Sequence, residues 1–135
     1  MNDFFAFFYE TLGYIKGFSE ELYNSGVYVT IGFLMLIISA VGMVAYYYLI
    51  NHPKFNRWWH WLLVVIVLAA INFGIAWAMS DGVIWSNNKQ TIPDNYYVSY
   101  FVTFAFINAL WSTLFSFAFS MIIKWKSSNC KYSPF

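Results

Sequence analysis

The stretch WLLVVIVLAAINFGIAWAM, residues 61 to 79, carries no charged side chain and decides the fold class of this chain. A helix rises about 1.5 Å per residue and the hydrocarbon core of a bilayer is about 30 Å thick, so about 20 apolar residues suffice to cross it. This stretch therefore predicts a transmembrane helix. Two further uncharged stretches, residues 26–50 and 96–123, are longer and are expected to tilt or to project into the headgroup region.

The composition of the whole chain also indicates a membrane protein. Of its 135 residues, 61% are hydrophobic, 24% aromatic and only 10% charged, whereas globular chains have about 45–50% apolar and about 25% charged residues. Lipid cannot satisfy the backbone of an open sheet, so the spans are expected to be helical. We therefore predict an all-α integral membrane protein with a bundle of three transmembrane helices over residues 26–125, placed in a bacterial inner (plasma) membrane.

The distribution of Lys and Arg predicts the orientation. In a three-span chain, the loop between the first two spans and the tail after the third lie on the same side. That side receives five basic residues and the other side receives two. The five are Lys54, Arg57, Lys124, Lys126 and Lys131, and the two are Lys16 and Lys89. Because basic residues stay cytoplasmic, we expect the N-terminus outside and residues 126–135 as a short basic cytoplasmic tail.

Aromatic and basic residues around the start of the second span predict a membrane interface. Trp suits the headgroup region because its apolar ring has one polar edge, and Lys and Arg can extend their charges to lipid phosphates. The predicted interfacial set is Trp58, Trp59, His60, Trp61, Lys54, Arg57 and Trp125. A haem or quinone site would need a second ligand from another span, and the only other histidine, His52, lies in the same loop. We therefore expect no cofactor.

Residues 1–25 predict an amphipathic helix. Apolar residues recur there every three or four positions, and acidic residues occupy the other face. The apolar stripe consists of Phe4, Phe8, Leu12, Ile15, Phe18 and Leu22. The segment is too charged to span, so we expect it to lie in the membrane interface. Because its polar face is acidic, burial of Phe side chains must hold it there.

Within the spans, the polar residues are neutral. Pumps and ion-coupled transporters usually need an intramembrane charge, and the middle of these spans has none. The third span has a polar stripe of residues four apart, and the second has a ridge of small residues. The stripe is Asn108, Ser112, Ser116 and Ser120, and the ridge is Ala70, Gly74 and Ala78. Two interpretations stay open: both are helix-packing faces, or the stripe lines a water-filled path made by several copies.

Asn72 of the second span and Asn108 of the third are expected to face each other. Counted along the helix from the start of its span, Asn72 lies about 17 Å from the cytoplasmic face of the hydrocarbon core. Asn108 lies about 12 Å from the outer face, so in a core about 30 Å thick the two depths nearly coincide. An unpaired amide in hydrocarbon is costly. We therefore predict that the two residues face protein and pair with each other, with a nearby Ser, or with a backbone carbonyl.

No catalytic constellation is evident. The chain has one Cys and two His without metal-ligand spacing, no Gly-rich phosphate loop, and no basic stripe for nucleic acid. We expect no enzymatic activity, no small-molecule substrate and no nucleic-acid partner.

Three functions fit these features. The first is a non-enzymatic subunit that anchors or scaffolds a larger inner-membrane assembly, such as a secretion, envelope-spanning or energy-transducing complex, with lipid and other membrane subunits as partners. The alternatives are a homo-oligomeric pore and a membrane-resident immunity or regulatory protein. The plan of three spans with a basic tail resembles one class of phage holins, which implies an oligomer that breaches the membrane. The dense aromatics and the amphipathic N-terminal helix are not part of that plan.

Overall fold

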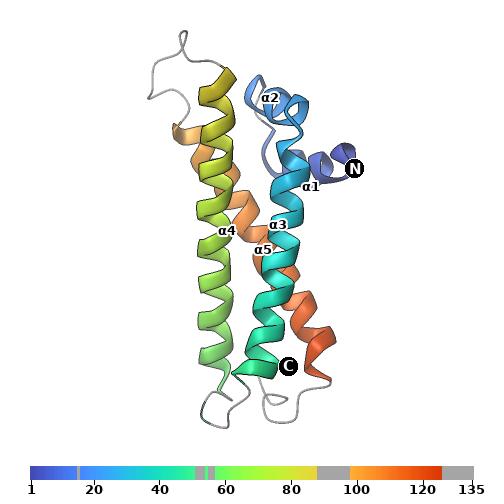
Figure 1. Ribbon diagram of the computed structural model, residues 1–135, viewed down its shortest axis with the longest axis vertical. Coiled ribbons are helices and arrows are strands. Elements are labelled where there is room, and N and C mark those ends of the chain that lie inside the picture. The colour runs from blue at the N-terminus through green and yellow to red at the C-terminus, as the bar shows by residue number, and fades with distance from the viewer. Residues whose placement is uncertain (15, 51–53, 55–56, 88–97, 126–135) are drawn as a thin grey trace.

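The computed structural model describes residues 1–14, 16–50, 54, 57–87 and 98–125, and this part of the chain is helical and contains no strand. Figure 1 shows the arrangement of the helices. In chain order they are α1 (Asn2–Gly13), α2 (Phe18–Asn24), α3 (Val27–Val44), the π-helix η1 (Ala45–Leu49), α4 (Trp58–Asn87) and α5 (Val98–Lys124).

Three helical stretches are long and apolar enough to cross a membrane, which confirms the predicted spans. They are Val27–Leu49, Trp58–Ser86 and Val98–Lys124. The second is longer than the predicted 61–79 because polar side chains beyond Met79 find hydrogen-bond partners on the same helix. The Ser80 hydroxyl donates to the Ala76 carbonyl at 2.7 Å, and Trp85 Nε1 donates to Asp81 Oδ1 at 2.8 Å.

The long helices form an antiparallel bundle with two distinct ends. In Figure 1, α3 and α4 run along the long axis and α5 crosses behind them on a diagonal. One end, which we call the α2 end, holds α2, the end of α4 and the start of α5. The other, the η1 end, holds η1, the start of α4 and the end of α5. Near the α2 end, α1 lies crosswise to the long helices and contacts α3 and α5.

Two glycines on α3 permit close packing of its neighbours. A Cβ atom at Gly32 would lie 2.2 Å from the Phe5 ring of α1, and one at Gly42 would lie 2.4 Å from a methyl group of Leu68 on α4. Real Cβ atoms essentially never approach so closely. Glycine at these positions is therefore what lets α1 and α4 pack directly against the α3 backbone.

Two apolar clusters fill the bundle. The larger one lies toward the α2 end and includes Phe5, Tyr9, Phe18, Leu22, Tyr28, Ile31, Ala76, Phe101 and Phe104. The smaller one lies toward the η1 end and consists of Met43, Tyr46, Tyr47, Trp61, Val65 and Leu68. On α3 and α4, the buried polar residues Ser39 and Asn72 fall between the members of the two clusters.

The N-terminal segment is two helices, not the single helix expected over residues 1–25. Tyr14 has an extended backbone (φ −74°, ψ 124°), and Gly17 has a φ of 85°. This left-handed conformation favours glycine because glycine has no Cβ. The chain therefore turns between α1 and α2, and the turn changes the helical phase.

The residues that face the bundle differ accordingly from the expected stripe. On α1 the buried residues are Phe5, Ala6 and Tyr9, whereas Phe4, Phe8 and Leu12 are exposed or half-buried. On α2, Phe18 and Leu22 are buried within the bundle, and Ile15 lies outside the described residues. Packing against α3 selects the face of α1 that presents Phe5 to Gly32, and the contact of the predicted stripe with lipid stays a prediction.

Candidate functional site: a buried polar seam

Asn72 and Asn108 are fully buried where α4 and α5 meet. The Asn108 Nδ2 group donates to the backbone carbonyl of Asn72 at 2.9 Å. The Asn72 Nδ2 group donates to Ser112 Oγ at 2.7 Å and to the Leu68 carbonyl at 3.1 Å. Both amides thus face protein and bond across the helix pair, which is the arrangement predicted from their depths.

The whole polar stripe of α5 faces the bundle interior, where each of its residues is at most 4% exposed. We call this stripe and its hydrogen-bond partners the polar seam. Its members are Asn108, Ser112, Ser116 and Ser120 of α5, together with Tyr9, Ser39, Tyr47, Trp61 and Asn72. Because α1, α3, η1 and α4 each contribute a partner, the seam ties these elements to α5.

Toward the α2 end, α1 joins the seam through Tyr9. The Tyr9 hydroxyl donates to Asn108 Oδ1 at 2.8 Å. Burial raises the pKa of Tyr9, so the phenol stays protonated and remains a donor. One turn further along α5, the hydroxyls of Ser39 and Ser112 share a hydrogen bond of 3.2 Å.

Toward the η1 end, Ser120 joins η1 and α4. It shares a hydrogen bond of 2.5 Å with the Tyr47 hydroxyl and accepts one of 2.9 Å from Trp61 Nε1. Trp61 is only 9% exposed. It therefore faces the bundle interior, where its indole N–H finds a protein partner, and its place at the depth of the lipid headgroups stays a prediction.

The other predicted interfacial residues lie at the η1 end. Trp58 and Trp59 stack with their ring centroids 3.9 Å apart and are about half exposed. Lys54, Arg57 and Trp125 are exposed, and His60 is half-buried. Their contact with lipid headgroups stays a prediction.

The small-residue ridge of α4 does not pack inside the chain. Ala70, Gly74 and Ala78 are exposed, and a Cβ atom at Gly74 would meet nothing within 4 Å. The role of the ridge as a helix-packing face stays a prediction, and its outward position has a geometric reason. At 3.6 residues per turn, turning Asn72 and Ala76 inward places the ridge on the opposite side of α4.

Sequence reasoning missed Tyr9, Tyr47 and the bonding role of Ser39. Tyr9 lies 99 residues before its partner Asn108, and no local pattern reports so distant a pairing. Tyr47 is one of three consecutive tyrosines, and η1 buries it together with Tyr46. For Ser39, the only signal was its place as a neutral polar residue within an apolar span.

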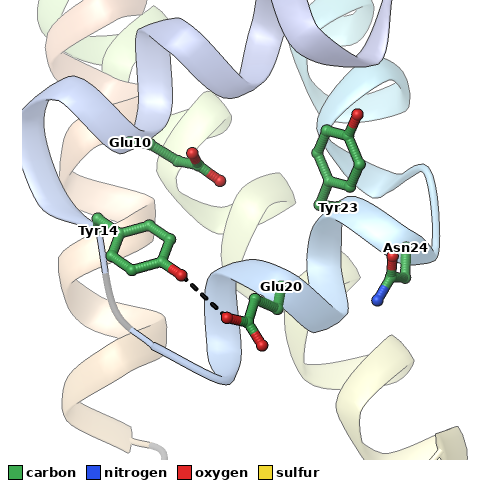
Figure 2. Close-up of a pocket in the computed structure, with 5 residues that line it drawn as sticks. All are labelled: Glu10, Tyr14, Glu20, Tyr23 and Asn24. Carbon is green, nitrogen blue, oxygen red and sulfur yellow. Dashed lines mark hydrogen bonds between the residues drawn. The ribbon is translucent and has the colours of Figure 1, made fainter.

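A polar hollow of about 380 Å³ lies between α1 and α2 (Figure 2). It is lined by Glu10, Tyr14, Glu20, Tyr23 and Asn24. The Tyr14 hydroxyl donates to Glu20 Oε1 at 3.1 Å, and this bond raises the pKa of Tyr14. The hollow is open, and two of its five lining side chains already bond to each other, so it is a weaker candidate than the seam.

The chemistry of the seam is that of neutral groups: amides, hydroxyls, phenols and one indole. Such groups can fix helices relative to one another and can bind a neutral polar molecule, but they carry no charge. Within the described residues, no group of three or more His, Cys, Asp or Glu could hold a metal ion. Neither a family model, nor a curated protein, nor a solved structure matches this chain.

Proposed function

We propose that this chain is a non-enzymatic membrane subunit that anchors or scaffolds a larger assembly in a bacterial inner membrane. The observation that carries the proposal is the division between its interior and its surface. The polar stripe of α5 is buried inside one chain, where Asn108, Ser112 and Ser120 bond to other helices, while the small-residue ridge of α4 faces outward. Small residues let helices approach closely in lipid, so the ridge suits a helix of a partner subunit.

The charge distribution supports an orientation with the N-terminus outside. Lys54, Arg57 and Lys124 lie at the η1 end. The acidic residues that the structure describes lie in α1, in α2 and in the last turns of α4, all toward the other end: Asp3, Glu10, Glu20, Glu21 and Asp81. A cytoplasmic η1 end follows the positive-inside rule.

The edges of α1 support a place in the outer membrane interface. Its acidic edge faces α2, because Asp3 accepts a hydrogen bond from Tyr23 and Glu10 lines the hollow. Its other edge carries Phe8, whose ring lies 4.6 Å from that of Trp111, further toward the η1 end on α5. Water on the acidic edge and lipid beside the Phe residues is the usual division for an interfacial helix.

Extraction in a mild detergent, followed by native mass spectrometry, tests the proposal. We expect the 15.8 kDa chain to leave the membrane with at least one other protein. Gly74→Leu should release that partner, because the larger side chain blocks close approach at the ridge. Ala118→Leu is the matched control, since Ala118 is exposed on α5. A lone monodisperse chain in every mild detergent would contradict the proposal.

The pore alternative requires the Asn/Ser stripe to line water between copies. Burial of the stripe within one chain favours the packing interpretation instead. Dye uptake by cells expressing the chain at high level separates the two. Permeable cells would favour the pore, whereas intact cells would leave the scaffold as the better proposal.

A further inference from the structure

Ser116 is the exception within the polar seam. It is 0% exposed, and its Oγ atom has no hydrogen-bond partner among the described residues. Its neighbours one turn away on either side, Ser112 and Ser120, both bond to other helices. Lipid offers no donor or acceptor at this depth, so an unpartnered hydroxyl here needs an explanation.

The orientation of the Ser116 hydroxyl makes the case stronger. Hydroxyls on helices commonly bond to the carbonyl four residues earlier, and this chain uses that bond repeatedly. The examples are Thr103 to Ser99, Thr113 to Ala109 and Ser80 to Ala76. Ser116 makes no such bond. The Ser116 hydroxyl is therefore not satisfied by the carbonyl one turn earlier on its own helix.

A complementary atom lies in the same seam. Asn72 Oδ1 is also buried without a partner, although the Nδ2 group of the same side chain bonds to Ser112. Ser112 in turn precedes Ser116 by one turn of α5. The seam thus holds an unpartnered hydroxyl donor and an unpartnered carbonyl acceptor, both on fully buried residues joined through Ser112.

We propose that the polar seam binds an internal water molecule beside Ser116. The Ser116 hydroxyl donates to this water, and the water donates to Asn72 Oδ1. Buried waters typically make about three hydrogen bonds to otherwise unsatisfied groups, and the Ser112 hydroxyl is the neighbouring group available as a third. The water lies along α5 between the Ser39–Ser112 and Tyr47–Ser120 hydrogen bonds, and it gives Ser116 the partner that its neighbours in the stripe already have.

Water-to-protein magnetisation transfer in hydrated bilayers tests this site by solid-state NMR. We expect transfer from water to the side-chain amide of Asn72 and none to that of Asn108. Asn108 is the internal control because its Oδ1 and Nδ2 atoms both bond to protein. Absence of transfer to both amides would overturn the proposal by showing a dry seam. Equal transfer to both would overturn it in favour of a continuous water-filled path.

Two variants of Ser116 and one control variant identify the group that holds the water. Ser116→Ala removes the donor, and we expect transfer to the Asn72 amide to fall to the level of Asn108. Thr113→Ala should leave the transfer unchanged, because the Thr113 hydroxyl is exposed and bonds only to its own helix. Ser116→Cys keeps the side-chain shape with a weaker donor, so we expect an intermediate transfer. This variant provides the test if Ser116→Ala does not fold. Undiminished transfer in a folded Ser116 variant would contradict a water held by Ser116.

Discussion

Asn108 joins two helices, α1 and α4, to α5. Its amide donates to the Asn72 carbonyl on α4 and accepts from Tyr9 on α1. Hydrogen bonds between helices in lipid contribute about 0.6–2 kcal/mol. One side chain therefore stabilises both the α4–α5 pair and the docking of α1.

Replacing Asn108 by Leu tests this role. The substitution keeps the size of the side chain and leaves the Tyr9 hydroxyl without its acceptor, so we expect a loss of about 0.6–2 kcal/mol in the free energy of unfolding. Reversible unfolding in mixed micelles measures it. Thr113→Val, which removes a self-satisfied exposed hydroxyl, should cost much less. Equal losses would show that the seam does not contribute to stability.

Tyr9→Phe removes only the hydroxyl of the α1 tether. It leaves Asn108 Oδ1 buried and unpaired, so we expect a destabilisation of about 1–3 kcal/mol. Tyr14→Phe is the control, because Tyr14 is exposed and its bond to Glu20 lies at the surface. Thermal unfolding of both variants in detergent gives the comparison. A Tyr9→Phe protein as stable as Tyr14→Phe would indicate that ring packing alone holds α1.

At the scale of elements, α1 is fixed by the Gly32 contact as much as by hydrogen bonds. Gly32→Ala places a Cβ atom 2.2 Å from the Phe5 ring, and neither a ring nor a helix backbone can yield easily. Overpacking of this kind costs about 1–3 kcal/mol. We expect α1 to detach, which raises the labelling rate of a cysteine introduced at Ala6. Gly74→Ala is the matched control because nothing lies near it. Protection of the cysteine in the Gly32→Ala protein would refute the contact.

The pairing of α1 with α2 is expected to weaken at alkaline pH. The Tyr23 hydroxyl donates to Asp3, which raises the pKa of Tyr23, and the nearby Glu10 carboxylate adds to the effect. The folded state therefore favours the protonated phenol. The tether is complete below the pKa of a free tyrosine, about 10, and is lost as pH rises through the raised value. In the wild type, the distance between spin labels on α1 and α2 should increase only at high pH. In the Tyr23→Phe protein, the larger distance should be present at every pH. Separation at neutral pH in the wild type would contradict this tether.

At the scale of the whole molecule, charge and helix direction together predict the topology. With Cys130 replaced by Ser, a cysteine introduced at Asn24 should react with an impermeant thiol reagent added to intact cells. A cysteine at Lys54 should react only after the cells are opened. The loop residue Lys89, which lies outside the described residues, is expected on the Asn24 side. The opposite labelling pattern would invert the proposed orientation.

The three-span helical fold was determined by sequence alone. Uncharged runs long enough to cross a bilayer leave the backbone no other way to satisfy its hydrogen bonds. The depth of Asn72 and Asn108 followed as well, because helical rise converts residue number into distance. For the same reason, the stripe of Asn108, Ser112, Ser116 and Ser120 could be recognised as one face.

Only the tertiary structure decided what that face meets. Periodicity identifies a face but not its neighbour, so the inward turn of Tyr47 and Trp61 and the outward turn of the Gly74 ridge were not predictable. The break at Gly17 was missed because a regular apolar pattern continued across it. Docking of Phe5 onto Gly32 then selected a different face of α1. Such contacts join residues far apart in the chain, and close packing in three dimensions is what selects them.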